Sequence, residues 1–580
     1  MPRSWRFSPF DESSIRTLAG RLNISPVLAQ ILSARGFASP EHAGAFLDAR
    51  LGELHDPDGL PGISAAADRL VVALRDNRRI TIYGDYDVDG VTATSLLVQC
   101  LKLAGGTVEY YVPHRLEEGY GLNCEALSRL HERDPGMLVV TVDCGISSVR
   151  EALHARQLGL ELIITDHHEP SLELPQADCL VHPRLPGTSY PFEDLCGVGV
   201  AFKLAWAVCA RLGDGKKASP RMREFLLSAV GLAAVGTVAD VVPLLGENRV
   251  LVRYGLRSLC ERCSPGLKAL FATSGLAERG QLDAEDVAFT LAPRINAAGR
   301  LGQARLAVEL LTTENADRAA MLAKYLEEQN KARQTVEKRM FKQAKELIAA
   351  HPEWDDQPAL VLEHDDWHAG VIGIVASRVA EQFQKPAVLI SVADRGQPSQ
   401  GSARTFGPVD LHAALRASAA ELITYGGHRA AAGLRVARER IASFRAAFCR
   451  YVSEHHDGKA AASELRIDAE VRLADLTLRA VAEIERLGPF GRSNPRPILA
   501  SSRVELADAP RKMGEGERHL DLRVRHYGKV MRAIAFGRGE WAEEIANAGG
   551  PISISFAAAI NRFRGQEHVE LQLLDWQRHS

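Results

Sequence analysis

The segment ITIYGDYDVDGVTATSLL, residues 80–97, joins a short apolar run to a stretch with a helical pattern. Three carboxylates, Asp85, Asp87 and Asp89, stand at the junction. An apolar run that ends at glycine and aspartate is typical of a buried strand, and the residues after it fit a helix. A strand, an acidic turn and a helix in this order predict the first βα unit of an α/β domain.

Four more strand-like runs follow, with helical stretches between them, such as residues 92–103 and 147–158. This βαβ order predicts a mostly parallel, doubly wound sheet. The runs are VEYYV (108–112), MLVVTV (137–142), ELIIT (161–165) and CLVH (179–182).

The rest of the chain divides into three further regions. A charged stretch without glycine or proline, residues 314–350, predicts one long connecting helix, or two helices with a break near Gln329. A second α/β pattern begins near residue 358, and alternating strand patterns after residue 465 predict a small β-barrel. The domain boundaries that we predict are 1–312, 313–352, 353–458 and 463–580.

Composition narrows the class of protein. The chain has 580 residues, enough for several domains, and a net charge of -3, so any polyanion would need a local basic surface. Its nine cysteines lack disulfide-like spacing, which is typical of a reducing compartment. The sequence contains no uninterrupted apolar run of membrane-spanning length, so we expect a cytoplasmic protein.

Acidic groups and imidazoles follow three of the predicted strands. Asp85, Asp87 and Asp89 follow the first, and Asp143 follows the run 137–142. Ligands bind beyond the carboxyl ends of strands in open α/β sheets, so these groups should meet at one edge. The run 161–165 is followed by Asp166, His167 and His168.

Each of these residues alone has an ordinary explanation, because aspartate often caps a helix and two histidines can form a surface pair. Several carboxylates in one partly buried place repel one another unless a cation is present. Oxygen ligands with one or two imidazoles favour Mn²⁺ or Mg²⁺, and four or more carboxylates indicate two ions. Such a pair activates water and stabilises the leaving oxygen in phosphoryl transfer.

Other segments contain candidate phosphate-binding residues. Ser402 and Arg404 lie in GSARTFG (401–407), and Gly427 and His428 lie in the glycine-rich turn GGHRAAAG (426–433), which could equally be a close-packed turn. The segment PRINAAGR (293–300) adds polar candidates, with a structural arginine–carboxylate pair as the alternative; they are Arg294, Asn296 and Arg300.

The ordered motifs GDYDVDG (84–90), VDCG (142–145), TDHHEP (165–170) and GTVADVVPL (236–244) resemble those of the DHH phosphoesterase superfamily. Within it, VPHRLEEGYGLN, APRINAAGRL, GSARTFG and GGHRAAAG resemble the RecJ family of bacterial single-strand exonucleases. The resemblance covers essentially the whole chain, and it implies that the C-terminal barrel is an OB-fold.

The resemblance implies roles for the acidic residues. Asp143 would bridge two ions, Asp85 and His168 would lie beside the ligands or face the substrate, and Asp166 would orient His167. Other DHH families have a ligand histidine where this chain has Tyr83, so either Asp85 replaces it or a water does. The metal ligands carried over are Asp87, Asp89, Asp143, His167 and Asp240.

The resemblance also implies the substrate and the reaction. Arg115, Ser402 and Arg404 would grip a 5′ phosphate, and Tyr120 could stack on a base or be a buried tyrosine. The expected activity is 5′-to-3′ hydrolysis of single-stranded DNA to 5′ mononucleotides in recombination and repair, with two Mn²⁺ or Mg²⁺ ions. The alternative is a DHH phosphodiesterase that acts on short oligonucleotides or cyclic dinucleotides.

Further expectations concern partners and the barrel. The resemblance implies that a single-strand binding protein and a RecQ-type helicase are partners, and we expect a monomer. Basic residues of the barrel could line a groove for single-stranded DNA, or they could belong to a solvated surface. They are Arg523, Arg525, Lys529, Arg532, Arg562 and Arg564.

Overall fold

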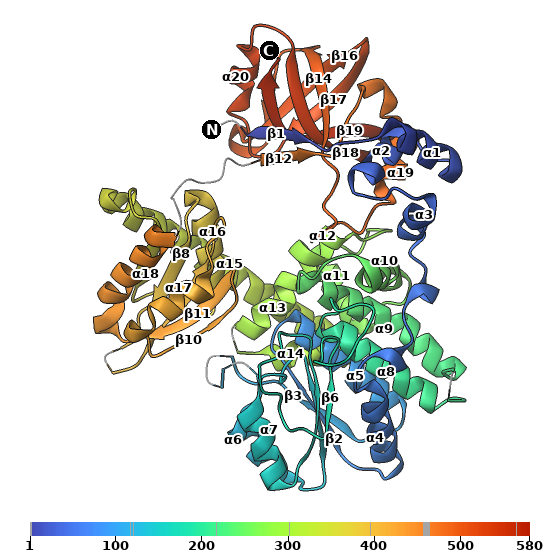
Figure 1. Ribbon diagram of the computed structural model, residues 1–580, viewed down its shortest axis with the longest axis vertical. Coiled ribbons are helices and arrows are strands. Elements are labelled where there is room, and N and C mark those ends of the chain that lie inside the picture. The colour runs from blue at the N-terminus through green and yellow to red at the C-terminus, as the bar shows by residue number, and fades with distance from the viewer. Residues whose placement is uncertain are drawn as a thin grey trace. The chain divides into compact units, whose positions relative to one another are not determined.

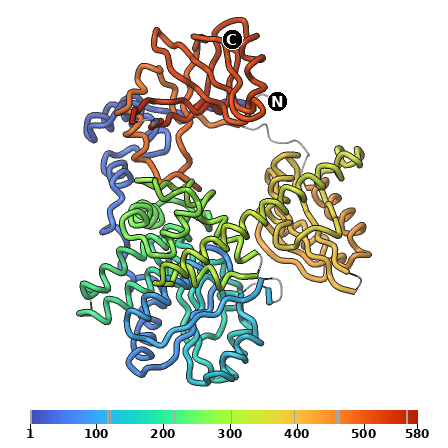
Figure 2. Tube along the Cα trace, turned by 180° about the vertical axis from the view of Figure 1, so that it is seen from behind, coloured from blue at the N-terminus to red at the C-terminus, as the bar shows by residue number. Residues whose placement is uncertain are grey.

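The computed structural model describes residues 3–115, 118–119, 121–215, 217–300, 302–394, 396–455, 464–563 and 565–579 (Figures 1 and 2). The chain divides into two compact units. One unit comprises Met1–Leu54, Pro243–Arg253 and Ala462–Ser580, and the other comprises His55–Val242 and Tyr254–Ala461.

The larger unit begins with a five-stranded sheet in the order β3-β2-β4-β5-β6, and every neighbouring pair is parallel. All five predicted strands are confirmed. Strands β2 and β4 are buried along their whole length, because a parallel sheet is covered on both faces. The strands are β2 (Ile80–Gly84), β3 (Val108–Tyr111), β4 (Leu138–Val142), β5 (Glu161–Thr165) and β6 (Cys179–Val181).

Helices cover both faces of this sheet, which confirms the doubly wound arrangement (Figure 1). Helices α6 (Cys124–Arg133) and α7 (Val149–Leu158) pack together on one face, over a core that contains Tyr83. The other face carries α4 (Ile63–Arg75), α5 (Val88–Leu103), α8 (Gly197–Arg211) and α9 (Pro220–Ala239).

Helix α9 is long and apolar enough to cross a membrane, and it is alone in this among the helices of the described residues. It packs against α5 and α8, and 61% of its most apolar window is buried. These contacts are those of a core helix in a globular domain.

A helical region follows and ends in α15 (Ala316–Ala350), which runs unbroken for 35 residues. The prediction of one connecting helix is therefore confirmed, and the alternative break near Gln329 is wrong. The preceding elements are α10 (Gly246–Glu261), α11 (Pro265–Ser274), α12 (Ala284–Asp286), the π-helical turn η3 (Val287–Leu291), α13 (Ala292–Arg300) and α14 (Ala304–Thr312).

Helix α15 leads into the second α/β domain, whose sheet has the order β10-β11-β9-β8-β7. The side chains of Met340, Ala344 and Ile348 on α15 belong to one of its two cores. Its strands are β7 (Leu360–His364), β8 (Ala387–Ser391), β9 (Ser399–Arg404), β10 (Thr424–Gly427) and β11 (Ala431–Val436), and its helices are α16 (Ile372–Phe383), α17 (Leu411–Ala417) and α18 (Ile441–His455).

The smaller unit joins both ends of the chain. Strand β1 (Ser4–Phe7) pairs in parallel with β12 (Glu464–Ile467), and the apolar side chains of α1 (Glu12–Leu22), α2 (Pro26–Ala34) and α3 (Pro40–Asp48) enter the same core as the C-terminal strands. The structure therefore differs from the prediction that placed these helices in the first domain, because their apolar faces are buried against the C-terminal sheet. The other predicted domain boundaries stay predictions.

The C-terminal sheet has the order β13-β14-β18-β19-β17-β16-β15, with a further pairing of β14 and β16. That pairing closes β14, β18, β19, β17 and β16 into a circuit. The elements are β13 (Ala469–Glu470), β14 (Leu499–Leu506), β15 (Arg511–Met513), β16 (His519–His526), β17 (Lys529–Ala535), β18 (Ile552–Phe563) and β19 (Gln566–Arg578), with α19 (Leu478–Glu485) and α20 (Trp541–Ala546).

Candidate active site

The turn after β2 places three carboxylates at the start of α5. Asp87 is the N-cap residue of this helix, and its Oδ1 accepts a hydrogen bond from the Gly90 N–H at 3.1 Å. The cap explains why α5 begins at Val88, earlier than the apolar pattern predicts. Asp85 and Asp89 lie on either side of the cap and are 3% and 1% exposed.

Asp89 is held by the N-terminus of α8. Its two carboxylate oxygens accept hydrogen bonds from the backbone N–H groups of Gly197, at 2.6 Å, and Val198, at 2.8 Å. The amino end of a helix carries partial positive charge and favours a carboxylate there. The side chain of Asp89 is therefore fixed in orientation without a lysine or arginine partner.

Two glycines that the sequence analysis missed make room for these carboxylates. A Cβ atom on Gly197 would lie 2.5 Å from Asp143 Oδ1, and one on Gly236 would lie 2.7 Å from Asp89 Oδ1. Glycine inside a helix usually weakens it, so it often marks a close approach of other groups. The sequence contained this signal, because Gly197 and Gly236 both lie within apolar segments with a helical pattern.

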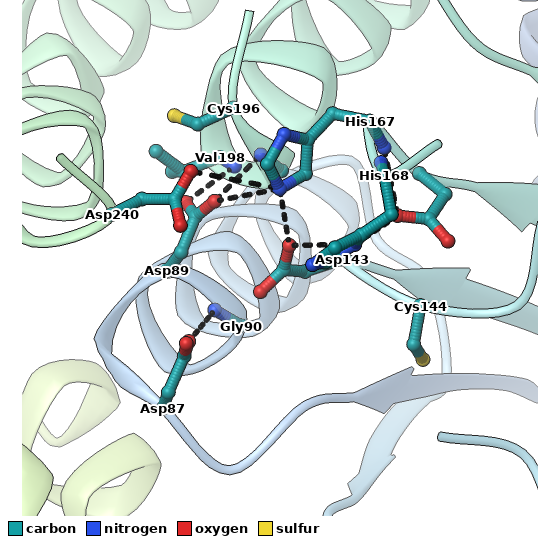
Figure 3. A network of polar contacts seen from close by, with 12 residues as sticks. Asp87, Asp89, Gly90, Asp143, Cys144, His167, His168, Cys196, Val198 and Asp240 are labelled. Atoms are coloured by element: carbon teal, nitrogen blue, oxygen red, sulfur yellow. Dashed lines mark hydrogen bonds and ion pairs between the residues drawn. The ribbon is translucent and has the colours of Figure 1, made fainter. Parts of the chain in front are cut away.

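His167 lies at the centre of the acidic groups (Figure 3). Its Nε2 is 3.1 Å from Asp143 Oδ1, and the nearest oxygens of Asp240 and Asp89 are at 3.6 and 3.8 Å. Burial, followed by the neighbouring charge of His168, lowers the pKa of His167 to about 3. A neutral imidazole surrounded by carboxylates is suited to donate its lone pair to a metal ion.

Asp240 follows α9 as its C-cap residue. A carboxylate at the carboxyl end of a helix is unfavourable to the helix dipole. The next residue, Val241, has a φ of 59°, and Asp143 has a φ of 63°. Strained backbone at Asp143 and directly after Asp240 is typical of functional sites, and a β-branched residue such as Val241 is rare in this region.

Asp166 organises the turn after β5. Its Oδ1 is 2.7 Å from His168 Nδ1 and accepts a hydrogen bond from the His167 N–H, and its Oδ2 accepts one from the Ile146 N–H. Burial alone would lower the pKa of His168, but the hydrogen bond to Asp166 and its charge raise it to about 9. Asp166 thus orients the ring of His168, whereas we had expected it to orient His167.

The acidic residues form what we call the carboxylate cluster: Asp85, Asp87, Asp89, Asp143 and Asp240. Burial and the neighbouring carboxylate Asp87 raise the pKa of Asp89 to about 7, and burial also raises the pKa of Asp85 and Asp143. For Asp85 and Asp143, the charges of neighbouring carboxylates raise the pKa further. Such shifts mean that the ionised cluster lacks sufficient positive charge from the protein.

Three sets of donor atoms in the described residues are compact enough to hold an ion, with all atoms of a set within 4.8 Å. Asp85 Oδ1 is buried and has no hydrogen-bond partner among the described residues, as expected for an atom suited to a cation. The donor chemistry therefore fits Mn²⁺ or Mg²⁺. The sets are Asp85, Asp87 and Asp143; Asp89, His167 and Asp240; and Asp143, His167 and His168.

Tyr83 is a core residue. It is fully buried, and its hydroxyl donates a hydrogen bond to the Gly121 carbonyl at 3.0 Å. Asp85, two residues further along the chain, belongs to one of the three donor sets. The geometry thus favours Asp85, rather than a residue at position 83, as a possible ligand.

A second cluster consists of arginines, which we call the arginine cluster: Arg115, Arg300, Arg333 and Arg404. Burial and the charges of the other three arginines lower the pKa of Arg300 to about 10. Burial and the charge of Arg115 also lower the pKa of Arg404. Buried like charges of this kind favour binding of an anion.

The predicted pair Ser402 and Arg404 lies on β9, and both side chains approach the start of α16. Arg404 Nη1 donates a hydrogen bond to Ser402 Oγ at 2.9 Å. A Cβ atom on Gly373, in the first turn of α16, would lie 2.9 Å from Arg404 Nη2 and 3.1 Å from Ser402 Oγ. A serine, an arginine and a helix N-terminus are three groups that bind phosphate.

The two clusters are neighbours. The charge of Arg115 acts on Asp85, and the charge of Asp87 acts on Arg300. The guanidinium of Arg115 also lies over the ring of Tyr86, 4.8 Å from its centroid. Cation-binding and anion-binding groups are therefore adjacent in one unit.

Arg333 is a member of the arginine cluster that the sequence analysis missed. It lies on α15, and its guanidinium donates hydrogen bonds to Glu337 Oε2 and Asn330 Oδ1, both at 2.9 Å. Its side chain is 11% exposed. A long charged helix contains many such residues, so no local signal distinguished this one.

Other predicted substrate residues have different surroundings. Arg294 donates to Glu327 Oε2 at 2.7 Å and to the Thr290 carbonyl, so it forms the ion pair given as the alternative. Asn296 is half-buried on α13, the helix that ends at Arg300. Tyr120 lies outside the described residues.

The segment GGHRAAAG forms a hairpin between β10 and β11. Gly427 has a φ of 126°, and a Cβ atom there would lie 2.6 Å from the Ala431 carbonyl oxygen. The backbone N–H of His428 donates to that same carbonyl, while its side chain is exposed. Gly427 therefore has a steric role in the turn.

The basic residues of the C-terminal sheet are only partly available to a ligand. Arg532 pairs with Asp521 and Glu570, and Arg562 pairs with Glu567. Arg523 lies 3.8 Å from a carboxylate of Asp508, whereas Arg525 and Lys529 are exposed. Arg564 lies outside the described residues.

Three families match successive parts of the chain. Residues 79–233 match the DHH family, N-terminal domain, residues 356–454 match the DHHA1 domain, and residues 467–575 match the RecJ OB domain. The three matches occur in the order of the first α/β domain, the second α/β domain and the C-terminal sheet.

Related proteins and solved structures match the chain over nearly its whole length. A single-stranded-DNA-specific exonuclease RecJ from Bacillus subtilis is 36% identical over 98% of this chain and 70% of the relative. The RecJ of Escherichia coli is 33% identical, over 94% of this chain and 95% of the relative. A crystal structure of RecJ with Mn²⁺ from Thermus thermophilus is 33% identical, covers 99% of this chain and 79% of that chain, and superposes with a TM-score of 0.82.

Proposed function

Because this chain belongs to the RecJ family of single-stranded-DNA-specific exonucleases, we propose that it removes nucleotides from the 5′ end of single-stranded DNA. The observation that carries the proposed polarity is the proximity of the two clusters. One cluster has the donors for divalent cations, and the other has the partly buried guanidinium groups for a terminal phosphate.

The carboxylate cluster would hold two Mn²⁺ or Mg²⁺ ions. Asp85, Asp87 and Asp143 would hold one ion, and Asp89, His167 and Asp240 the other, with Asp143 close to both. When bound, such ions activate a water molecule and stabilise the charge on the leaving 3′ oxygen. Family structures were solved with Mn²⁺ and with Mg²⁺, which supports this choice of metals.

The residues of the chain itself position the reacting groups. The N-terminus of α8 fixes Asp89 in one orientation, and burial keeps the imidazole of His167 neutral. His168, paired with Asp166, stays protonated at neutral pH because its pKa lies near 9. We assign His168 the role of a cationic group that stabilises the negative charge developing on the scissile phosphate.

The arginine cluster would determine polarity. Arg115, Arg404 and Ser402 would bind the terminal 5′ phosphate, and Arg300 would contact it from α13. A chain end captured there would present the next phosphodiester bond to the carboxylate cluster. The product would then be a 5′ mononucleotide, released before the strand advances.

The cellular setting is proposed from family membership. We infer that the protein acts in the cytoplasm as a monomer, in DNA recombination and repair. A single-strand binding protein and a RecQ-type helicase would supply its single-stranded substrate.

A labelled-end assay tests the proposed function. Single-stranded DNA labelled at its 5′ end would be compared with the same strand labelled at its 3′ end, with Mn²⁺ and with chelator. We expect immediate release of a labelled mononucleotide from the 5′ label, progressive shortening of the 3′-labelled strand, and no reaction with chelator. Hydrolysis of very short oligonucleotides alone would instead support the phosphodiesterase alternative.

A further inference from the structure

Phe289 is an apolar side chain exposed to solvent in the larger unit. It is 78% exposed, which makes it the most exposed phenylalanine of the described residues. A single exposed apolar residue is common on protein surfaces and needs no explanation by itself. The position of Phe289 in its helix gives the reason to assign it a role.

Phe289 lies in the π-helical turn η3, between α12 and α13. Wide turns of this kind are rare inside helices and occur often at functional sites. The buried stripe of this helical segment contains Val287, Leu291 and Ile295, and Phe289 points away from it. The turn therefore holds the phenyl ring on the side of the helix that the core does not use.

The same helical segment leads to the arginine cluster. Phe289 lies in η3, Asn296 lies in α13, and Arg300 is the last residue of α13. A rise of 1.5 Å per residue separates Phe289 and Arg300 by about 16 Å along the helix axis. Gly299 brings the end of the same helix against the Tyr86 carbonyl, at the turn that carries Asp85 and Asp87.

The other neighbour of η3 also ends at the site. The turn packs against α9, whose C-cap residue is Asp240 of the carboxylate cluster. Phe289 is thus exposed on a turn that continues into α13, which ends at the anion-binding groups, and that packs against α9, which ends at the cation-binding groups. The length of helix between Phe289 and Arg300 suits contact with a nucleotide a few positions away from the cleaved bond.

We propose that Phe289 stacks on a base of the single-stranded DNA, a few nucleotides to the 3′ side of the scissile phosphate. The inference rests on the proposed function, because it takes single-stranded DNA as the ligand. Aromatic rings stack on every base, so this contact would add affinity without sequence preference. It would affect only substrates long enough to reach from the arginine cluster to η3.

Kinetics on short and long strands tests this contact. We expect Phe289→Ala to raise the KM for a long 5′-phosphorylated strand about tenfold, because one aromatic–base stack has roughly that effect on affinity. The kcat on the long strand and both constants on a dinucleotide should stay unchanged. Phe289→Trp should restore the KM, and Leu153→Ala, which removes an exposed apolar side chain from α7, should have no effect.

A fluorescence scan locates the contact. The base 2-aminopurine would be placed at successive positions of the strand, and its quenching by the protein would be measured in chelator. We expect one position near the 5′ end to lose its quenching in Phe289→Ala and to regain it in Phe289→Trp. An unchanged scan with an unchanged KM, or a raised KM accompanied by a lower Tm, would overturn the proposal. If the wild-type protein failed to degrade 5′-phosphorylated strands, the proposed function itself would be wrong.

Discussion

The carboxylate cluster and the arginine cluster are both partly or fully buried groups of like charge, but the chain assembles them differently. The carboxylates stand in turns that follow adjacent strands of one sheet or at helix ends that pack on it. The arginines come from four segments that are far apart in sequence: the loop after β3, the end of α13, the middle of α15 and the end of β9. Sheet topology brings four of the five carboxylates together, and the packing of α9 on α5 and α8 adds Asp240, whereas the second group needs the packing of two domains and the helix between them.

Both clusters are shifted away from their charged forms. The pKa of Asp85, Asp89 and Asp143 is raised, and the pKa of Arg300 and Arg404 is lowered, in each case mainly by burial. A buried charge without a partner is costly, so each cluster is suited to a ligand of opposite sign. A DNA strand with a 5′ phosphate, together with divalent ions, would complement both clusters at once.

The largest effect should follow from a change in the carboxylate cluster. We expect Asp143→Asn to lower kcat by about a thousandfold or more, because Asp143 is shared between donor sets. The same variant should melt at a higher temperature than the wild type in chelator, because one buried negative charge is lost. Nuclease assays and thermal melts with and without Mn²⁺ would measure both effects.

The matched control is Asp366→Asn, which removes an exposed carboxylate of the second α/β domain and should change neither quantity. A Mn²⁺-dependent rise in Tm that stayed the same in Asp143→Asn would contradict the assignment of Asp143 as a ligand.

A slightly smaller effect should follow from filling the space beside Asp143. Gly197→Ala would place a methyl group 2.5 Å from Asp143 Oδ1, so the carboxylate or α8 must move. We expect kcat to fall about a hundredfold and stability to fall by about 1–3 kcal/mol. Gly20→Ala is the control, because its Cβ would meet no atom within 4 Å. Wild-type activity in Gly197→Ala would show that this close contact is unimportant.

The arginine cluster should respond to the chemistry of the strand end. We expect Arg404→Ala to raise the KM for a 5′-phosphorylated strand about tenfold to a hundredfold, since hydrogen bonds to charged groups are stronger than average. The KM for a 5′-hydroxyl strand should change little. Arg416→Ala, an exposed arginine of α17, is the control. Equal effects on both strand ends would remove the basis for the proposed polarity.

The smallest effect should come from outside both clusters. Arg525 and Lys529 are exposed on the C-terminal sheet, so replacing both with alanine should reduce the salt dependence of DNA binding by about two phosphate contacts. Arg532→Ala should instead lower Tm, because Arg532 is paired with Asp521 and Glu570. Binding measured across a salt series, with thermal melts in parallel, separates the two outcomes.

The sequence predicted the carboxylate cluster well because strand ends in a parallel sheet share one edge. It also predicted α15 from an uninterrupted helical composition. It did not predict Gly197, Gly236 or Arg333, since their importance depends on atoms that approach from other elements. The role of Arg294 as a substrate residue stays a prediction, and the sequence did not show that its ion-pair partner, Glu327, lies on a different helix.

Packing between distant segments explains the remaining differences. The first three helices of the chain look like ordinary amphipathic helices, and nothing in their pattern names the sheet that buries them. Likewise, the spacing of glycines in GGHRAAAG suits a helix start as well as a hairpin, and the pairing of β11 with β9 decides between them. The burial of these helices and the conformation of this turn depend on long-range contacts rather than on local propensity.

The unbroken course of α15 has a consequence for how the length of this chain can vary. Each inserted or deleted residue would rotate everything beyond it by about 100° and shift it by about 1.5 Å along the axis. Arg404 and Ser402 lie beyond the helix, whereas Arg115 and Arg300 lie before it. Insertions that evolution tolerates should therefore cluster in surface loops. The length of α15 should stay constant, because it sets the position of Arg404 and Ser402 relative to Arg115 and Arg300.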